Sequence, residues 1–133
     1  MRTVFLDTVG LIALWDRTDQ WRQAADAAKA SLGAPGIRLV TTSQVLLECG
    51  NAAARKPYRS DVCLLRERLK RQGNLINPTD TDTEEAWRDF RQNTADGAGI
   101  VDHVSFIIMR RMGITDAFTN DRHFKAAGFN TLF

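Results

Sequence analysis

Two kinds of hydrophobic pattern alternate along the chain. Short runs of β-branched and aromatic residues predict buried strands, and longer runs with apolar residues three or four positions apart predict amphipathic helices. Gly and Pro punctuate them, as in "GAPG" at 33–36. We expect strands at 3–6, 38–41, 75–77, 116–119 and 129–133, and helices at 8–16, 19–32, 42–56, 60–73, 79–93, 100–112 and 120–127. This alternation predicts an α/β/α sandwich around a mostly parallel five-stranded sheet, with residues 1–133 forming a single domain.

Two helix details follow from the same pattern. The helix within 79–93 is expected to begin after a cap at Thr81 or Thr83, with acidic residues in its first turn. A glycine-containing hinge at 96–99 is expected to separate it from the next helix.

The composition narrows the class of protein. The chain has 133 residues, of which 44% are apolar and 26% charged, which is typical of a globular domain and excludes a disordered chain. No apolar run approaches the roughly 18 residues of a membrane span, and the N-terminus does not have the pattern of a signal peptide, so we expect a cytoplasmic protein without membrane contact. Cys49 and Cys63 lie in apolar helical contexts and are expected to be buried free thiols, which fits a reducing compartment.

Charge is distributed unevenly although the net charge is only +2. Seven basic residues and only two acids lie in the segment 55–71, whereas seven acids and two arginines lie in 80–102. The basic segment suits a polyanion such as nucleic acid, but a solvated helix face gives the same pattern.

Four acids are candidates for chemistry, and each has a structural alternative. Asp7 follows the first strand and is a natural helix cap, while Glu48 lies on a polar helix stripe that faces either solvent or a crevice. Asp102 lies in a helix that is apolar nearly all round, where it either complements the helix dipole or serves a site. Asp121 follows the fourth strand and is also a possible cap.

These acids are expected to converge, because ligands bind parallel sheets at the carboxyl ends of the strands. Two carboxylates about 4 Å apart repel by roughly 4 kcal/mol at an effective dielectric near 20, so a cluster must take up protons or bind a cation. Carboxylate ligands suit Mg²⁺ or Mn²⁺. The two histidines, His103 and His123, lack a second histidine at ligand spacing, which argues against zinc, and His123 has the pattern of a packed, hydrogen-bonded histidine.

Four stretches resemble a known family: "FLDTVGLIALWD" from 5, "LLECGNAAAR" from 46, "IVDHVSFIIMRRMGIT" from 100 and "DAFTNDRHFKAAGF" from 116. They are similar to the PIN-domain ribonucleases, especially the VapC-like toxins of bacterial toxin–antitoxin pairs. The resemblance covers nearly the whole chain, and its tail motif is the most specific part.

The resemblance implies a Rossmann-like PIN fold with sheet order 3-2-1-4-5 and endoribonuclease activity that depends on Mg²⁺ or Mn²⁺. It also implies a homodimer and inhibition by a small antitoxin protein. The family's catalytic, metal-binding acids fall on Asp7, Glu48, Asp102 and Asp121, and its supporting polar residues on Thr8, Thr119 and Asn120. The chain departs from many relatives at Val9 and Gly99, where a serine is common, and this bears on substrate contacts rather than on the acids.

The leading hypothesis is therefore a metal-dependent endoribonuclease whose RNA substrate is attracted by Arg55, Lys56 and Arg59. One alternative is a non-catalytic PIN-like module that binds RNA or protein. Another is an aspartate-dependent phosphatase, although that chemistry requires a second acid at position 9, where the chain has Val9.

An antitoxin is expected to place an Arg or Lys against the acids and an apolar segment beside them. Trp15 and Trp21, in the first two helices, either contribute to such an interface or pack between helices.

Overall fold

The computed structural model describes residues 1–93 and 97–133. Its five parallel strands form one sheet in the order β3-β2-β1-β4-β5, which confirms the expected fold class and strand order. The elements are β1 (Arg2–Leu6), α1 (Thr8–Trp15), α2 (Arg22–Leu32), β2 (Ile37–Thr42), α3 (Ser43–Ala53), α4 (Arg59–Gln72), β3 (Leu75–Ile76), α5 (Asp80–Gln92), α6 (Ile100–Met112), β4 (Asp116–Phe118), α7 (Arg122–Ala126) and β5 (Asn130–Thr131).

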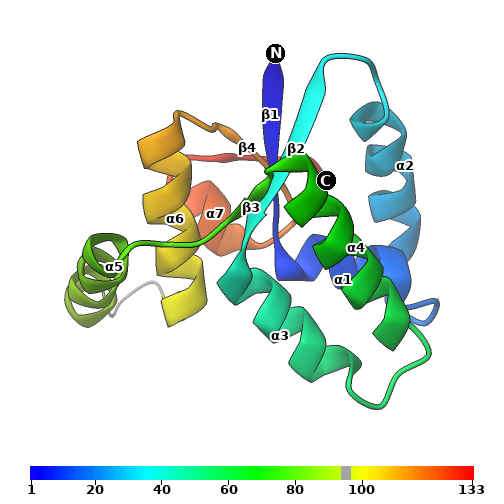
Figure 1. The fold of residues 1–133 in the computed structure, drawn as a ribbon, viewed down its shortest axis with the longest axis horizontal. Helices are drawn as coiled ribbons and strands as arrows, with labels where there is room; N and C mark the ends of the chain where they lie inside the picture. The colour runs from blue at the N-terminus through cyan, green and yellow to red at the C-terminus, as the bar shows by residue number, and fades with distance from the viewer. Residues whose placement is uncertain (94–96) are drawn as a thin grey trace.

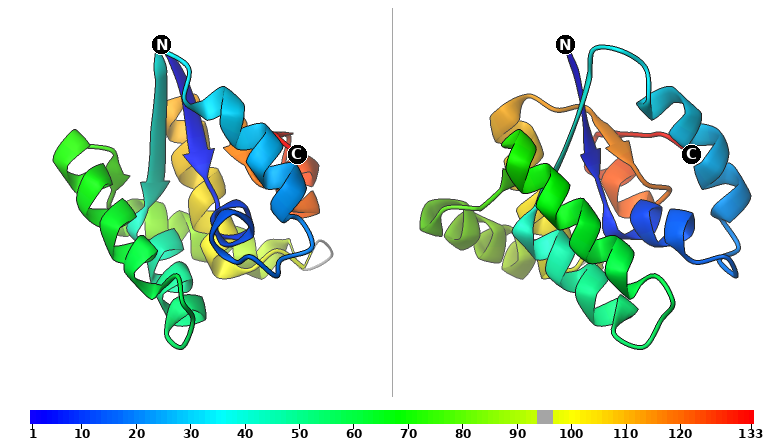
Figure 2. Two further views of the ribbon diagram at one scale, coloured as in Figure 1. Left: turned by 90° about the vertical axis from the view of Figure 1, so that its right-hand side faces the viewer. Right: turned by 45° about the vertical axis from the view of Figure 1, so that its right-hand side comes forward.

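The sheet lies between two helical layers (Figure 1). Helices α1 to α4 cover one face and α5, α6 and α7 cover the other, as the turned views of Figure 2 also show. The chain builds outward from β1 through β2 to β3, then returns to place β4 on the opposite side of β1. The change of direction falls between β1 and β4. A crevice forms at such a switch point, beyond the carboxyl ends of the two strands.

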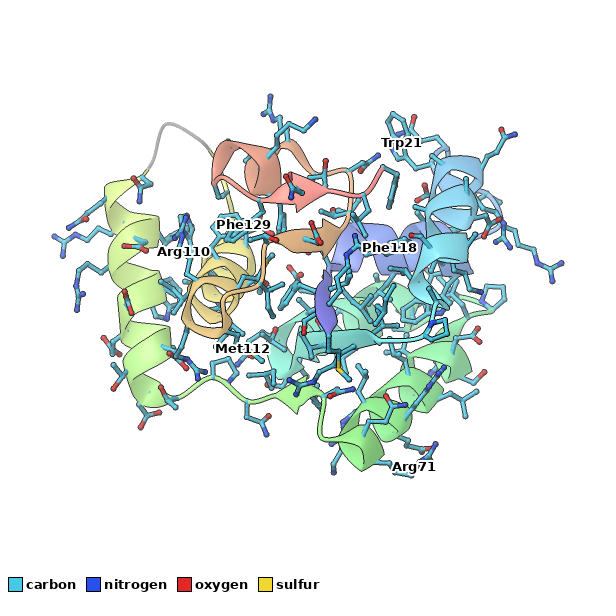
Figure 3. All side chains as sticks on the ribbon, turned by 90° about the horizontal axis from the view of Figure 1, so that it is seen from above. Trp21, Arg71, Arg110, Met112, Phe118 and Phe129 are labelled. Atoms are coloured by element: carbon cyan, nitrogen blue, oxygen red, sulfur yellow. The ribbon has the colours of Figure 1, made fainter. Side chains whose placement is uncertain are left out.

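The core explains why the central strands are continuous apolar runs. Val4, Phe5 and Leu6 of β1 are all buried, since both faces of the strand are covered. On the side of α6 and α7, Phe106 and Phe124 meet edge to face with ring centres 5.0 Å apart. Viewed from above, Phe129 lies beside Arg110 of α6, whose guanidinium carbon is 5.5 Å from the ring centre (Figure 3).

Some local expectations were wrong. The cap of α5 is Thr79 rather than Thr81 or Thr83: its hydroxyl accepts from the backbone N–H of Asp82, whose carboxylate accepts from the backbone N–H of Thr79. Asp82 also pairs with Arg111 of α6 at 3.1 Å, which ties the start of α5 to the neighbouring helix. Cys49 is buried as expected, but Cys63 is exposed.

Helix boundaries differ by a few residues from the pattern. Helix α2 begins at Arg22 rather than near 19, because turns stabilised by Asp16 and Asp19 occupy the preceding residues. Of the expected hinge at 96–99, residue 96 lies outside the described residues, and Gly97 has a positive φ of 68°. Within residues 1–93 and 97–133, no helix is long and apolar enough to cross a membrane.

Candidate metal centre and its family

Asp7 lies at the switch point, directly after β1. Its side chain is only 2% exposed, and although it occupies the cap position of α1, it makes no side-chain capping bond. Instead, its Oδ2 accepts a 2.8 Å hydrogen bond from the Thr119 hydroxyl, which follows β4. The carboxylate therefore joins the ends of two neighbouring strands, so the capping alternative does not describe it.

Burial raises the pKa of Asp7 to about 7, because the charged form loses its hydration. The Thr119 hydroxyl opposes this rise, whereas the negative charges of Asp102 and Asp121 add to it. Their influence shows that the three carboxylates share one electrostatic environment.

Asp102 reaches the same region from the first turn of α6. Its Oδ2 accepts from the backbone N–H of Gly99 at 3.2 Å, so it does complement the start of its helix. Burial, followed by the charge of Asp121, raises the pKa of Asp102 to about 6, and Glu48 contributes in the same direction. An acid that served only its helix dipole would be expected to have a lowered pKa. Asp102 therefore complements the start of α6 and also lies near the other carboxylates.

The segment after β4 supplies a third carboxylate. Thr119 is fully buried, and its hydroxyl oxygen accepts from the backbone N–H of Asp121 at 3.1 Å while donating to Asp7. Asp121 caps α7 through Oδ1, which accepts from the backbone N–H of His123 at 2.8 Å. Asn120 lies between them and is half-buried. The tight turn thus fixes Asp121 beside the switch point.

Glu48 approaches from α3. Its Oε1 accepts a 2.7 Å hydrogen bond from the hydroxyl of Thr8, in the first turn of α1. Glu48 is exposed, but its bond to Thr8 and the effect of its charge on Asp102 place it beside the crevice. Thr8 and Thr119 therefore play parallel parts, each donating to one acid.

The tightest group contains a residue that the sequence did not select. One ligand atom each from Asp102, Asp121 and His123 lie within 4.8 Å of one another, a spacing suited to a metal ion. Asp7 and Glu48 lie outside this group, although the charges of Asp102 and Asp121 raise the pKa of Asp7, and the charge of Glu48 raises the pKa of Asp102. The available signal for His123 was its position two residues after a capping Asp, where the first turn brings both side chains together.

The donor set fits a divalent cation. Two carboxylates with raised pKa values in a shared environment are stabilised by a positive charge, and carboxylate oxygens are preferred ligands of Mg²⁺ and Mn²⁺. Asp102 and Asp121 would hold such an ion, with Asp7 and Glu48 close enough to act on it electrostatically.

The predicted RNA-binding residues lie elsewhere. Arg55 and Lys56 lie in the exposed turn that follows α3, and Arg59 is the exposed first residue of α4 (Figure 1). Arg59 donates to the carbonyl oxygen of Ala54 at 3.1 Å, which ties it to the end of α3. The structure does not bring these residues into the acid cluster.

Comparison with known proteins identifies the family. A profile of the PIN domain matches residues 4–130. The chain belongs to the PIN domain family. The resemblance seen in the sequence is thereby confirmed, and the match runs from within β1 to the first residue of β5.

Solved structures of other proteins are similar over nearly the whole chain. Mycobacterium tuberculosis VapC20, described as a toxin that cleaves the sarcin–ricin loop, is 26% identical with a TM-score of 0.80, and the match covers 96% of both chains. VapBC-1 of nontypeable Haemophilus influenzae is 15% identical (TM-score 0.63, 98% of both chains), and FitAcB of Neisseria gonorrhoeae is 15% identical (TM-score 0.64, 96% of this chain and 95% of that one). The latter two show similarity of fold alone. No curated protein is significantly similar in the corresponding search.

Proposed function

We propose that this PIN domain is a Mg²⁺- or Mn²⁺-dependent endoribonuclease and the toxin of a toxin–antitoxin pair. The observation that carries the proposal is the convergence of Asp102 and Asp121 beside buried Asp7, each acid contributed by a different segment at one edge of the sheet. The similarity to a toxin that cleaves RNA supports the choice of substrate class.

The residues of the chain have separable parts in this chemistry. Asp102 and Asp121 hold the ion, while the hydroxyls of Thr119 and Thr8 hold Asp7 and Glu48 in place. Burial of Asp7 excludes water from its carboxylate and strengthens its interaction with any nearby cation. When bound, a divalent cation supplies a Lewis acid that lowers the pKa of water and offsets the charge developing on a phosphodiester.

In this proposal, basic residues guide RNA toward the acid cluster. Arg55, Lys56 and Arg59 are exposed between α3 and the start of α4, and they would attract the phosphate backbone without reading its sequence. Replacing all three by Gln should weaken RNA binding and flatten its salt dependence, while Mn²⁺ affinity stays unchanged.

An antitoxin and a second copy of the chain are the proposed partners. A groove of about 420 Å³ between α1, α2 and α4 is lined by apolar side chains that include Trp15, Leu64 and Leu65. Leu64 is 61% exposed, and Trp21, which precedes α2 and does not line the groove, is 47% exposed. Large exposed apolar side chains are typical of surfaces that another molecule covers. Trp15 stacks on Tyr58, so it contributes to packing as well as to the groove. The solved toxin–antitoxin assemblies of this fold support a protein partner here.

Cleavage of total cellular RNA tests the enzymatic proposal. The purified protein should cut RNA at discrete sites with Mn²⁺ or Mg²⁺, and activity should be lost in excess chelator. The cleavage rate of the Asp102→Asn variant should be at least about 100-fold below that of the wild type, because a metal ligand is replaced. The Asp26→Asn variant, altered on the exposed face of α2, should remain active. Full activity of Asp102→Asn in a folded protein, or cleavage in chelator, would contradict the proposal. A protein that binds RNA without cutting it would instead be the non-catalytic module.

The partner proposal is tested separately by co-expression with the neighbouring reading frame. A small protein should co-purify and abolish cleavage, and the free PIN domain should sediment as a dimer. A monomer that is harmless when produced alone would contradict both the toxin and the dimer.

A further inference from the structure

His123 lies against the acid cluster rather than in the apolar core. Its Nδ1 is 2.9 Å from Oδ1 of Asp121, and the group that it forms with Asp102 and Asp121 spans less than 4.8 Å. A packed, hydrogen-bonded histidine would be expected to have protein partners for both ring nitrogens. Nε2 is buried and has no hydrogen-bond partner among residues 1–93 and 97–133. In that part of the chain, Nδ1 therefore contacts Asp121, and Nε2 makes no hydrogen bond.

We propose that His123 supplies a nitrogen ligand to the ion held by Asp102 and Asp121, and that this nitrogen makes the site favour Mn²⁺ over Mg²⁺. The inference rests on the proposed function, because it concerns the same ion. It adds a ligand of a different chemical type to a set that the sequence predicted to consist of carboxylates.

The spacing of the groups agrees with a shared ion. Two ligand atoms at right angles around an ion, each about 2.1 Å from it, lie about 3 Å apart. Nδ1 of His123 and Oδ1 of Asp121 have this separation. The backbone N–H of His123 also donates to the same oxygen at 2.8 Å, so the first turn of α7 holds both side chains in a fixed relation. Asp102 completes the group from a different helix, α6.

The metal preference follows from ligand chemistry. Mg²⁺ is a hard ion that takes oxygen ligands and keeps several waters, so an imidazole contributes little to its binding. Mn²⁺ binds nitrogen more weakly than the later divalent transition metals, but it is softer than Mg²⁺ and accepts an imidazole nitrogen alongside carboxylates more readily than Mg²⁺ does. Loss of the imidazole should therefore weaken Mn²⁺ binding and leave Mg²⁺ binding nearly unchanged.

The decisive measurement is electron spin-echo spectroscopy of the full-length protein loaded with Mn²⁺, which detects nitrogen bound to the ion without relying on activity. We expect a nitrogen coupling in the wild type, its loss in His123→Gln and its retention in His103→Gln. Since the chain has two histidines, this pair of variants assigns the signal. A wild-type spectrum without directly coordinated nitrogen overturns the inference, and this result does not depend on either variant folding.

Calorimetry provides the second readout. His123→Gln should bind Mn²⁺ about tenfold more weakly or worse, while its Mg²⁺ affinity changes by less than about threefold. Equal losses for both ions would make His123 a residue that only positions Asp121, and unchanged Mn²⁺ affinity would remove it from the site; either result overturns the inference. If the wild type cleaves RNA and binds Mn²⁺ without nitrogen coupling, the proposed function survives and only this inference fails. If the wild type binds Mg²⁺ but no Mn²⁺, only this inference fails, and if it binds neither ion, the proposed function itself fails.

Discussion

Replacing Asp7 by Asn should stabilise the metal-free protein at alkaline pH. Asp7 is buried, and its pKa is raised from the ordinary 3.8 to about 7, first by burial. Asn is neutral and nearly the same shape, and its side-chain carbonyl can still accept from the Thr119 hydroxyl that now donates to Asp7. The substitution therefore removes a buried charge and keeps the hydrogen bond that holds the strands together.

The expected effect depends on pH in a defined direction. Because the folded pKa lies above the unfolded pKa, the folded protein binds the proton more tightly, and this stabilisation is complete below 3.8 and lost as the pH rises through about 7. The rise from 3.8 to about 7 corresponds to about 4 kcal/mol as an upper limit, of which about 3 kcal/mol is lost between pH 5 and pH 8. Relaxation of the structure and entry of water reduce this value. Between pH 5 and pH 8, we therefore expect the free energy of unfolding of Asp7→Asn to rise by about 1–3 kcal/mol relative to that of the wild type.

Urea unfolding in chelator at pH 5, 6.5 and 8 measures this gain. The relevant quantity is the change with pH in the stability difference between Asp7→Asn and wild type, because any packing effect of the amide is the same at each pH. Asp26→Asn, which replaces an exposed acid on α2, controls for a general loss of negative charge. A stability difference that stays constant with pH would refute the reasoning that Asp7 is ionised at a cost in the folded protein.

Three further outcomes are expected. Gly10→Ala should lower the free energy of unfolding by about 1–3 kcal/mol in urea, since the added methyl group would collide with the Phe118 carbonyl and ring. Gly50→Ala, where the added methyl group meets open space, should keep or raise the free energy of unfolding. Asp82→Ala should lose about 1–2 kcal/mol because it removes the capping partner of α5 and the ion pair with Arg111; an unchanged melting temperature would contradict this. Mn²⁺ at a hundredfold excess over Kd should stabilise the wild type by about 2.7 kcal/mol, seen as a higher melting temperature, and an unchanged melt would contradict binding to the folded state.

The elements of the fold followed from local pattern. Apolar runs, turn residues and helix periodicity depend on neighbouring positions, which is why the strands agree with expectation. The order of the strands in the sheet was implied by the resemblance to PIN domains and is confirmed by the structure. Helix boundaries were less well determined, because several residues could serve as the N-cap. Three threonines lie at or near the start of α5, and the structure uses Thr79 with Asp82, which also pairs with Arg111 on another helix. Exposure of Cys63 could not be derived from an apolar helical context, since it depends on which neighbours cover that face.

The sequence by itself determined that Asp7 and Asp121 would lie at one edge of the sheet, because strands that run parallel must bring their carboxyl ends together. The sequence could not determine which of the side chains at this edge contact one another. Only the tertiary structure decided that Asp7 bonds to Thr119 instead of capping its own helix, and that His123 joins Asp102 and Asp121. Those relations depend on distances between atoms from separate segments, and a few ångströms, set by how α6 and α7 pack on the sheet, distinguish a metal ligand from a helix cap or a buried histidine.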